Sequence, residues 1–332
     1  MNSTLSKIEY ILPEKVITNE QLSQEFPEWQ ADKIAEKVGI KFRHVVLDNE
    51  TATDLAIQVS EKLFETYNKK KIDFLLYCTQ SPDYILPTSA CIIQDKLGLN
   101  KSIGALDFNL GCSGYIYGLS LAKGLIKARI ATEILLITSE TYSKHLHKLD
   151  KGNRSIFGDG AAATVISACE KEKIGNFEFG TDGNGYDNLI IRNGGAKNRY
   201  QNNSRDIFDD SGFVRNDNCL YMNGPEIFNF TIQTIPSLVD QTLNKNNLSM
   251  ETIDYIIFHQ ANKFILDYLR KKLKIPLEKF YQNMENSGNT VSSTIPIALK
   301  DCLDKKIITK GNKVLIAGFG VGYSWGGTVI EI

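Results

Sequence analysis

Short apolar runs alternate with helix-patterned segments through the first half of the chain. The runs Ile72–Tyr77, Ile103–Phe108 and Glu133–Thr138 are typical of buried strands. Between them, apolar residues at helical spacing predict helices over Thr88–Leu97 and Tyr115–Ala128. Alternation of this kind favours an α/β fold, in which helices cover a largely parallel sheet.

Three segments of the first half recur in the second half, in the same order. The pairs are Ile72–Tyr77 with Ile253–Phe258, Ile134–Ile137 with Val314–Ala317, and Gly160–Ile166 with Trp325–Ile330. The first two pairs have nearly the same offset, 181 and 180 residues. This regularity predicts a duplicated unit, with an N-terminal half over residues 1–170 and a C-terminal half over residues 171–332. Residues 193–223 lack periodicity and are expected to form a long loop with a short hairpin.

Composition narrows the class of protein. The 38 Lys and Arg residues nearly balance the 39 Asp and Glu residues, so no overall basic field indicates nucleic-acid binding. The apolar runs are too short to span a membrane, and no secretory signal is visible at the N-terminus. Six cysteines without a C-x-x-C pair and four histidines argue against a structural metal site. We therefore expect a cytoplasmic protein with free thiols.

Cys112 is the first candidate for chemistry. It lies between an expected strand and an expected helix, in the run Gly111-Cys112-Ser113-Gly114. Unpaired N–H groups and the positive end of the helix dipole lower the pKa of a thiol at such a position. The alternative is a buried structural thiol, which is common for cysteine.

His259 and Asn289 are the second and third candidates. His259 directly follows the strand predicted over Ile253–Phe258, and sites gather at the carboxyl ends of parallel strands. Asn289 lies between an expected strand at Lys279–Gln282 and an expected helix over Val291–Leu303. Taken singly, the histidine could be structural and the asparagine a turn residue. The duplication, however, places Asn289 opposite the Cys112 turn.

A glycine-rich segment, Gly318–Gly327, completes the set. It lacks the spacing of a dinucleotide-binding fingerprint, and a strand follows it rather than a helix. Such a loop can present backbone N–H groups to an oxyanion beside a nucleophilic thiol. The alternative is a tight turn before an edge strand.

In this order and spacing, the motifs resemble those of the β-ketoacyl-acyl-carrier-protein synthase III family of thiolase-fold condensing enzymes. The resemblance extends from Leu12-Pro13-Glu14 to Trp325-Gly326 and includes Phe157–Ala161 and His259–Asn262. It implies two pseudo-twofold-related βαβαβαββ halves stacked as α/β/α/β/α layers. A Cys, His and Asn triad separates this family from elongating synthases, which carry a second histidine, and from degradative thiolases, which carry a second cysteine.

The resemblance implies an activity and a division of roles. Cys112 would take an acyl group from acyl-CoA, with the backbone N–H groups of Cys112 and Val321 as oxyanion hole. His259 and Asn289 would stabilise the enolate formed when malonyl-acyl-carrier protein loses CO2. The product would be a β-ketoacyl thioester for fatty-acid or related biosynthesis. No cofactor is implied beyond the coenzyme A thioester substrate, and a homodimer is expected.

The resemblance also implies contact residues and shows departures. The candidates for coenzyme A and carrier binding are Trp29, Lys37, Lys151, Asn262, Lys263, Arg270, Lys271 and Lys272. Lys37 and Lys151 stand where arginines are usual, and Phe264 stands where a basic residue is usual. Leu86 replaces a frequent aromatic residue that reaches the partner subunit's acyl tunnel, and Val321 replaces a glycine.

Two other functions stay open at this point. The same acyl-Cys112 could deliver its acyl group to an alcohol or amine of a specialised metabolite or sugar, without decarboxylation. A non-catalytic scaffold is the other alternative, and the presence of Cys112, His259 and Asn289 together argues against it.

Overall fold

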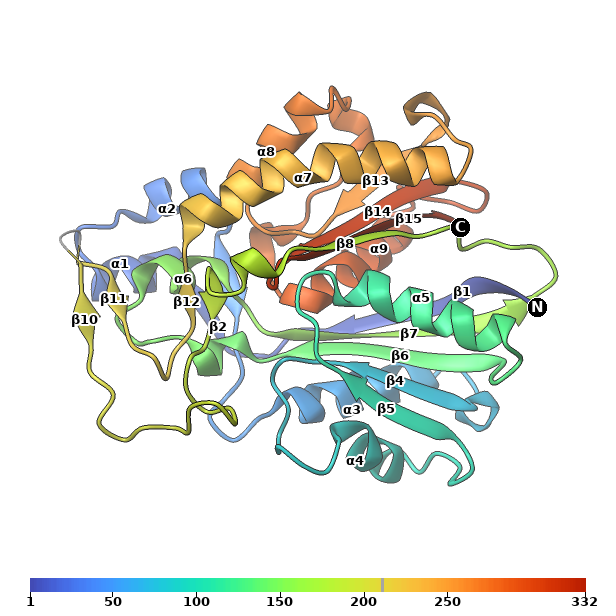
Figure 1. Cartoon of the computed structure of the whole chain (residues 1–332), viewed down its shortest axis with the longest axis horizontal. Coiled ribbons are helices and arrows are strands. Elements are labelled where there is room, and N and C mark those ends of the chain that lie inside the picture. Colours follow the sequence, from blue (N-terminus) through green and yellow to red (C-terminus); the bar gives the residue numbers. More distant parts are fainter. Residues whose placement is uncertain (210–211) are drawn as a thin grey trace.

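The computed structural model describes residues 1–209 and 212–332, and its first sheet is built from the N-terminal part of the chain (Figure 1). Its strand order is β1-β7-β6-β4-β5, and β7 runs antiparallel to both of its neighbours. The strands are β1 (Asn2–Ile11), β4 (Phe74–Cys78), β5 (Gly104–Phe108), β6 (Glu133–Glu140) and β7 (Gly160–Cys169). The three strands predicted from apolar runs are therefore confirmed as β4, β5 and β6, which lie side by side and parallel.

The second sheet repeats this order with strands from the C-terminal part. Its order is β13-β14-β15-β8, with β15 antiparallel to both of its neighbours. The strands are β8 (Glu178–Thr181), β13 (Tyr255–Phe258), β14 (Lys313–Gly320) and β15 (Ser324–Glu331). The strand expected over Lys279–Gln282 is wrong: Leu277–Lys279 is a 3-10 helix, and Phe280 makes an isolated parallel bridge to Ile256. This bridge occupies the position next to β13 that β5 takes next to β4.

Helices separate and cover the two sheets (Figure 1). The outer helices on the first sheet are α3 (Ala52–Phe64) and α4 (Ser89–Lys96). The outer helices on the second sheet are α7 (Gly224–Lys245) and α8 (Lys263–Lys272). Between the sheets lie α5 (Gly114–Lys127) and α9 (Thr294–Asp304), and both helices contact both sheets.

The central layer is held by one apolar core that spans the two sheets. Tyr115 and Leu119 of α5 pack with Leu136 of β6, Ile316 of β14 and Ile295 of α9, and all five side chains are buried. The helical spacing of apolar residues therefore supplies α5 with two buried faces, as a helix between sheets requires. The layered, thiolase-like α/β/α/β/α fold predicted from the resemblance is confirmed. The division into halves at residues 170 and 171 stays a prediction.

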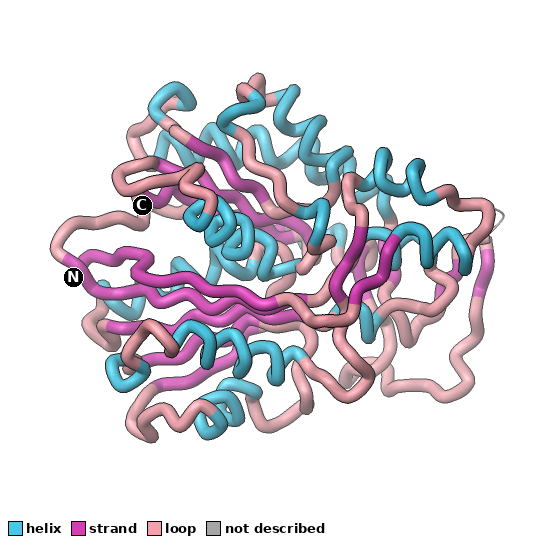
Figure 2. The backbone as a smooth tube through the Cα atoms, turned by 180° about the vertical axis from the view of Figure 1, so that it is seen from behind, coloured by secondary structure: helices cyan, strands magenta, loops and turns pink. Residues whose placement is uncertain are grey.

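The other α-helices and strands lie together at one end of the two sheets, at the left in Figure 1 and at the right in Figure 2. They are β2 (Val16–Thr18), α1 (Asn19–Glu25), α2 (Ala31–Val38), β3 (Phe42–His44), α6 (Lys151–Ile156), β9 (Leu189–Ile190), β10 (Ile207–Phe208), β11 (Val214–Arg215) and β12 (Tyr221–Met222). Within the long loop, β10 pairs with β11, and β12 near its end pairs with β9 just before the loop. Residues 210 and 211 of the expected hairpin lie outside the described residues. No helix in the described parts of the chain has the length and apolar character to cross a membrane.

Candidate active site

Cys112 lies in the turn that connects β5 to α5, where two glycines of β14 approach it closely. A Cβ atom on Gly320 would lie 2.7 Å from the Cys112 sulfur, and one on Gly318 would lie 2.7 Å from the Cys112 carbonyl oxygen. The backbone N–H groups of Val321 and Cys112 act on the thiol as hydrogen-bond partners. The glycine-rich segment therefore brings its backbone against the candidate nucleophile, which larger residues would prevent.

The expectation of a lowered thiol pKa is wrong for the free protein. Burial raises the pKa of Cys112 to about 12, since a thiolate loses its hydration in this position. The backbone N–H groups of Val321 and Cys112 lower the pKa but do not offset burial. The position of Cys112 before a helix correctly predicts nearby N–H donors. How deeply the thiol is buried depends instead on how the two sheets pack, which the local sequence does not show.

Asn289 is held in a turn that docks on the first half of the chain. Its backbone N–H donates to the Ile156 carbonyl over 2.9 Å, and its carbonyl accepts from the Gly158 N–H over 3.1 Å. Its side-chain oxygen accepts the N–H of Val291 over 2.9 Å, and its amide nitrogen donates to the Ala261 carbonyl over 3.4 Å. The amide is therefore fixed with its NH2 group as the available donor.

His259 follows β13 and is buried. Its Nδ1 lies 2.7 Å from the Thr294 hydroxyl oxygen, which is also 3.0 Å from the Val291 carbonyl oxygen. Burial lowers the pKa of His259 to about 3, and its hydrogen bond with the Val291 backbone raises it by less. The imidazole is therefore neutral near pH 7, and Nε2 is the nitrogen that can meet a substrate.

The three candidate residues converge through Val291 and the end of β14. Val291 packs in one buried apolar cluster with Cys112, while its backbone contacts the side chains of both Asn289 and His259. The His259 ring meets the ring of Phe319 edge to face, with 5.9 Å between centroids, and the next residue along the chain abuts the Cys112 sulfur. His259 and Asn289, which follow Cys112 by 147 and 177 positions, are thus linked to it through Val291, and His259 also through Phe319 and Gly320.

A polar network behind the Cys112 turn was not expected from the sequence. The Gln80 side chain accepts from the Tyr142 hydroxyl over 2.5 Å and donates to Asn109, three residues before the cysteine. Glu140, wholly buried, accepts the Gln80 N–H over 3.1 and 3.0 Å. Gln80 follows β4 and Glu140 ends β6, so the strand-end rule that singled out His259 also applies to them.

The candidate coenzyme A contacts surround a cavity of about 1010 Å³ between α2, α6 and the long loop. Trp29 and Lys37 line it, together with Phe213 of the loop. The Lys151 ammonium lies 5.8 Å from the centroid of the Trp29 ring and 5.2 Å from that of Phe213, and it pairs with Glu28 over 2.8 Å. Trp29 and Lys151 are therefore brought together, while Lys37 is exposed at the cavity edge.

A second, shallower groove of about 410 Å³ lies between α2 and α8. Lys37, Lys263 and Lys271 line it, around the exposed aromatic side chains of Phe264 and Tyr268. Three of the candidate contacts therefore share one groove with an aromatic centre. Its lysines outnumber the two acidic residues that also line it, Glu36 and Asp267, and Lys263 pairs with Asp267 over 2.6 Å.

The other candidate residues on α8 have structural partners. Asn262 caps the helix by accepting the Ile265 N–H over 2.9 Å, and Arg270 donates to the Ile275 carbonyl over 3.1 Å. The Lys272 ammonium donates to the Ile232 carbonyl over 2.7 Å. These hydrogen bonds explain why polar or basic residues stand at these three positions, without the need for a bound ligand.

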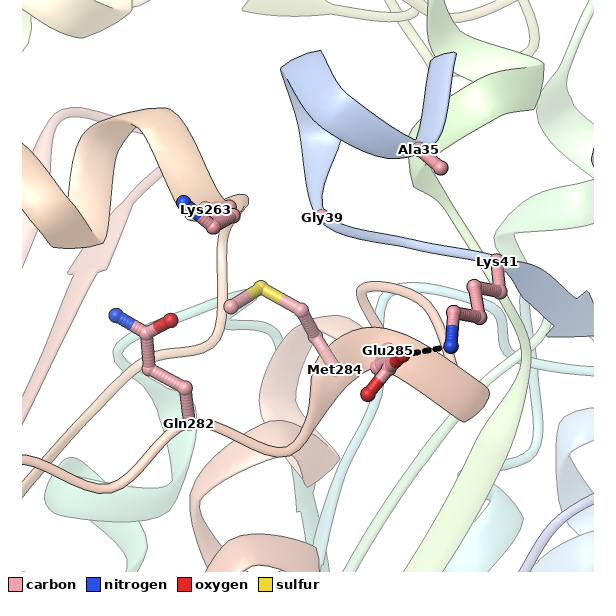
Figure 3. Close-up of a pocket in the computed structure, with 7 residues that line it drawn as sticks. All are labelled: Ala35, Gly39, Lys41, Lys263, Gln282, Met284 and Glu285. Carbon is pink, nitrogen blue, oxygen red and sulfur yellow. Dashed lines mark ion pairs between the residues drawn. The ribbon is translucent and has the colours of Figure 1, made fainter. Parts of the chain in front are cut away.

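A third hollow, of about 300 Å³, lies where α2 ends and α8 begins (Figure 3). Gly39, with a positive φ of 73°, packs under the Lys263 side chain, while Lys41 pairs with Glu285 over 2.5 Å. A larger residue at Gly39 would displace Lys263 from this position. The hollow therefore depends on the glycine that ends α2.

Leu86 lies away from the cysteine in this chain. It is 79% exposed, next to Ile85 at 84% and Tyr84 at 61%. Such a run of exposed apolar side chains is typical of an interaction surface.

Two family models match the chain. The model described as 3-oxoacyl-[acyl-carrier-protein] synthase III matches residues 106–183, and its C-terminal counterpart matches residues 243–332. A β-ketoacyl-[acyl-carrier-protein] synthase III of Clostridium perfringens is 38% identical over 323 residues, which cover 96% of each chain. A protein of the same name from Fusobacterium nucleatum is 34% identical over 327 residues, covering 97% of this chain and 96% of that one.

Solved structures agree with these matches. A crystal structure of a 3-oxoacyl-(acyl-carrier-protein) synthase III superposes with a TM-score of 0.98 at 47% identity and covers 100% of both chains. The 3-oxoacyl-(acyl-carrier protein) synthase of Burkholderia xenovorans gives 0.92 at 31% identity, covering 100% of this chain and 94% of that one. Together with the convergent cysteine, histidine and asparagine, these matches show that the chain belongs to the β-ketoacyl-[acyl-carrier-protein] synthase III family.

Proposed function

We propose that this chain transfers an acyl group from acyl-CoA to Cys112 and then condenses it with malonyl-acyl-carrier protein. The observation that carries the proposal is the convergence of Cys112, the β14 backbone, His259 and Asn289 on one buried position. Membership of the synthase III family supports the same activity.

In the first step, the Cys112 sulfur attacks the thioester carbonyl of acyl-CoA. A C–S bond forms at Cys112, the C–S bond to coenzyme A breaks, and the proton lost by the thiol ends on the coenzyme A sulfur. The N–H groups of Val321 and Cys112 stabilise the oxyanion of the tetrahedral intermediate. Burial disfavours a free thiolate at Cys112, which favours transfer of the proton in concert with formation of the C–S bond.

In the second step, malonyl-acyl-carrier protein loses CO2, and the electron pair passes to its thioester as an enolate. With its proton on Nε2 and with Nδ1 accepting from the Thr294 hydroxyl, the neutral His259 ring donates a hydrogen bond to the enolate oxygen, as does the Asn289 NH2 group. Neither group carries a negative charge that would repel the enolate. The enolate carbon attacks the carbonyl carbon of acyl-Cys112, a C–C bond forms, the C–S bond to Cys112 breaks, and the departing sulfur takes up one proton from water. With that proton the step balances, so the proposal calls for no further cofactor.

The two substrates are assigned to the two larger hollows. Trp29 and Lys37 would bind the nucleotide end of coenzyme A in the cavity of about 1010 Å³, since they offer an aromatic face and positive charge. Lys151, buried and paired with Glu28, would support the Trp29 ring from beside the cavity. Lys263 and Lys271 would meet an acidic carrier protein at the groove between α2 and α8. Asn262, Arg270 and Lys272 would contribute mainly by holding α8 in place.

We also propose that the protein acts as a cytoplasmic homodimer. The exposed Leu86 side chain would reach the acyl tunnel of the partner, and the reducing compartment would keep Cys112 as a thiol.

Intact-mass measurement tests the proposal directly. Incubation with a panel of acyl-CoA thioesters is expected to add one acyl mass to the wild-type protein, and Cys112→Ser is expected to remove this thioester adduct. Addition of malonyl-acyl-carrier protein should then release CO2 and give a β-ketoacyl product.

Other results would lead to other conclusions. Acyl transfer to an alcohol or amine without CO2 release would favour the alternative acyltransferase. A Cys112→Ala variant that retains full activity, or a wild-type protein that accepts no acyl group, would overturn the proposal.

A further inference from the structure

Val291 has a backbone conformation that valine rarely adopts, and it stands between two of the proposed catalytic side chains. Its φ of 55° is in the left-handed region, where a β-branched side chain is strained. Its N–H donates to the Asn289 side-chain oxygen, and its carbonyl oxygen lies 3.0 Å from the Thr294 hydroxyl, which contacts His259. The left-handed conformation is thus the one in which the backbone of Val291 meets both partners.

The residues after Val291 tie this strained turn to the first sheet. The Ser292 hydroxyl donates to Glu140 Oε1 over 3.1 Å. The Ser293 hydroxyl donates to the Thr138 carbonyl over 3.0 Å and lies 2.9 Å from the Thr138 hydroxyl. Both partners belong to the end of β6, so the turn is anchored to a strand of the other half of the chain.

The buried carboxyl group of Glu140 links the turn after Asn289 to the segment after β4. One oxygen accepts from Ser292, the other accepts from the Ser81 hydroxyl over 3.1 Å, and both lie close to the Gln80 N–H. A wholly buried carboxyl group is costly unless it is hydrogen-bonded, and each of these donors meets that need. The proposed chemistry does not use the group, and its bond to Ser292 is its link to the Asn289 turn.

We propose that Glu140 and Ser292 are positioning residues for the condensation step, because their hydrogen bond holds Val291 in the conformation that orients Asn289 and His259. The inference rests on the proposed function, since it assigns the pair to one of the two half-reactions. Acylation of Cys112 depends on the N–H groups of Val321 and Cys112, which this bond does not hold.

The test compares the two half-reactions in Ser292→Ala. Loss of one buried hydrogen bond should lower the rate of CO2 release from malonyl-acyl-carrier protein about tenfold, while the rate at which an acyl-CoA adds mass to Cys112 stays within about twofold. Glu140→Ala, which removes the acceptor, should lower CO2 release by at least a similar factor. The double variant should be no slower than the slower single variant, because both changes break the same bond.

Ser81→Ala is the control, since it removes the other hydroxyl bond to Glu140, also 3.1 Å long, without touching the Asn289 turn. It also removes the contacts of this hydroxyl with the Thr141 N–H and the His145 ring, so it is the more disruptive change. It should leave CO2 release within about threefold of wild type. Equal losses of acylation and CO2 release in Ser292→Ala, or wild-type CO2 release, would overturn the inference. Failure of the wild-type protein itself to release CO2 would instead count against the proposed function.

Discussion

His259 illustrates how burial of a single residue sets its chemistry. An imidazole whose pKa is lowered to about 3 donates through one nitrogen without carrying charge, which suits stabilisation of an enolate. The same burial has a cost in acid. Between pH 6.5 and about 3 the unfolded chain binds a proton at this position that the folded protein does not bind, so stability falls as the pH falls.

This residue therefore predicts a difference between wild type and His259→Gln. From pH 7 to pH 5 the wild-type free energy of unfolding should decrease by about 2 kcal/mol more than that of the variant. Urea denaturation at the two pH values measures this difference. Glu140 and Asp159, whose pKa values burial raises to about 8 and about 6, act in the opposite direction but are common to both proteins. Equal losses in the two proteins would show that His259 is protonated in the folded state.

Among single residues, the sequence could identify those that stand at the end of a predicted strand or at the start of a predicted helix. Cys112, His259 and Asn289 each follow or precede a predicted strand or helix. Thr294 and Ser292 gave no such signal, because hydroxyl residues near a helix start are common and usually cap it. The raised pKa of Cys112 was missed because it depends on the packing of β14, which is more than 200 residues away along the chain.

At the scale of elements, the site depends on the close approach of β14 to the turn before α5. The proposed oxyanion hole exists because the Val321 N–H reaches Cys112, and Gly320 leaves room for this. An alanine at position 320 would place its Cβ 2.7 Å from the sulfur, closer than such contacts allow, so the strand or the thiol must shift.

Gly320→Ala should therefore slow acylation of Cys112 by about a hundredfold, the effect expected of a misplacement of about 1 Å. Intact-mass kinetics with an acyl-CoA measure the rate. Gly124→Ala is the control, because a Cβ at this position in α5 meets no atom within 4 Å. An unchanged rate in Gly320→Ala would remove the β14 backbone from the proposed mechanism.

The loop that faces α2 gives a second prediction at this scale. Trp29 and Phe213 flank the Lys151 ammonium, and their rings meet edge to face with 6.4 Å between centroids. If this is the nucleotide end of the coenzyme A site, Trp29→Ala should raise KM for acyl-CoA about tenfold through lost stacking. The KM for an acyl-pantetheine, which lacks the nucleotide, should not change. Equal increases in KM for the two substrates would show that the nucleotide does not bind beside Trp29.

Elements with continuous apolar runs were predictable, and β4, β5, β6, β13 and β14 all lie within or next to the ranges expected. The exception is Lys279–Gln282, where only Phe280 bridges to β13. Leu277–Lys279 turns as a 3-10 helix and leaves too little extended chain for a ladder. The small β10 and β11 pairing depends on a loop whose sequence has no periodicity.

At the scale of the whole molecule, the internal repeat explains why one site draws on both halves. Equivalent strands β4 and β13 run through the two sheets, and the residues after each, Gln80 and His259, reach the same central region. The repeat was visible in the sequence because buried strands keep their apolar pattern. The oligomeric state could not be predicted from the sequence pattern in the same way, because it depends on which apolar side chains stay exposed after folding.

That exposure leads to a prediction about assembly. Ile85 and Leu86 present large apolar side chains to solvent at 84% and 79% exposure, and β5 is an edge strand of its sheet with Leu106 also exposed. Covering such surfaces against a second copy would remove apolar area from water at roughly 25 cal/mol per Å². Sedimentation at micromolar concentration should therefore show twice the 37.2 kDa chain mass.

Ile85→Glu should weaken the dimer and alter the acyl-CoA preference, whereas Leu277→Glu, at another exposed position, should do neither. A wild-type monomer would place the acyl group entirely within one chain and leave Leu86 without a role.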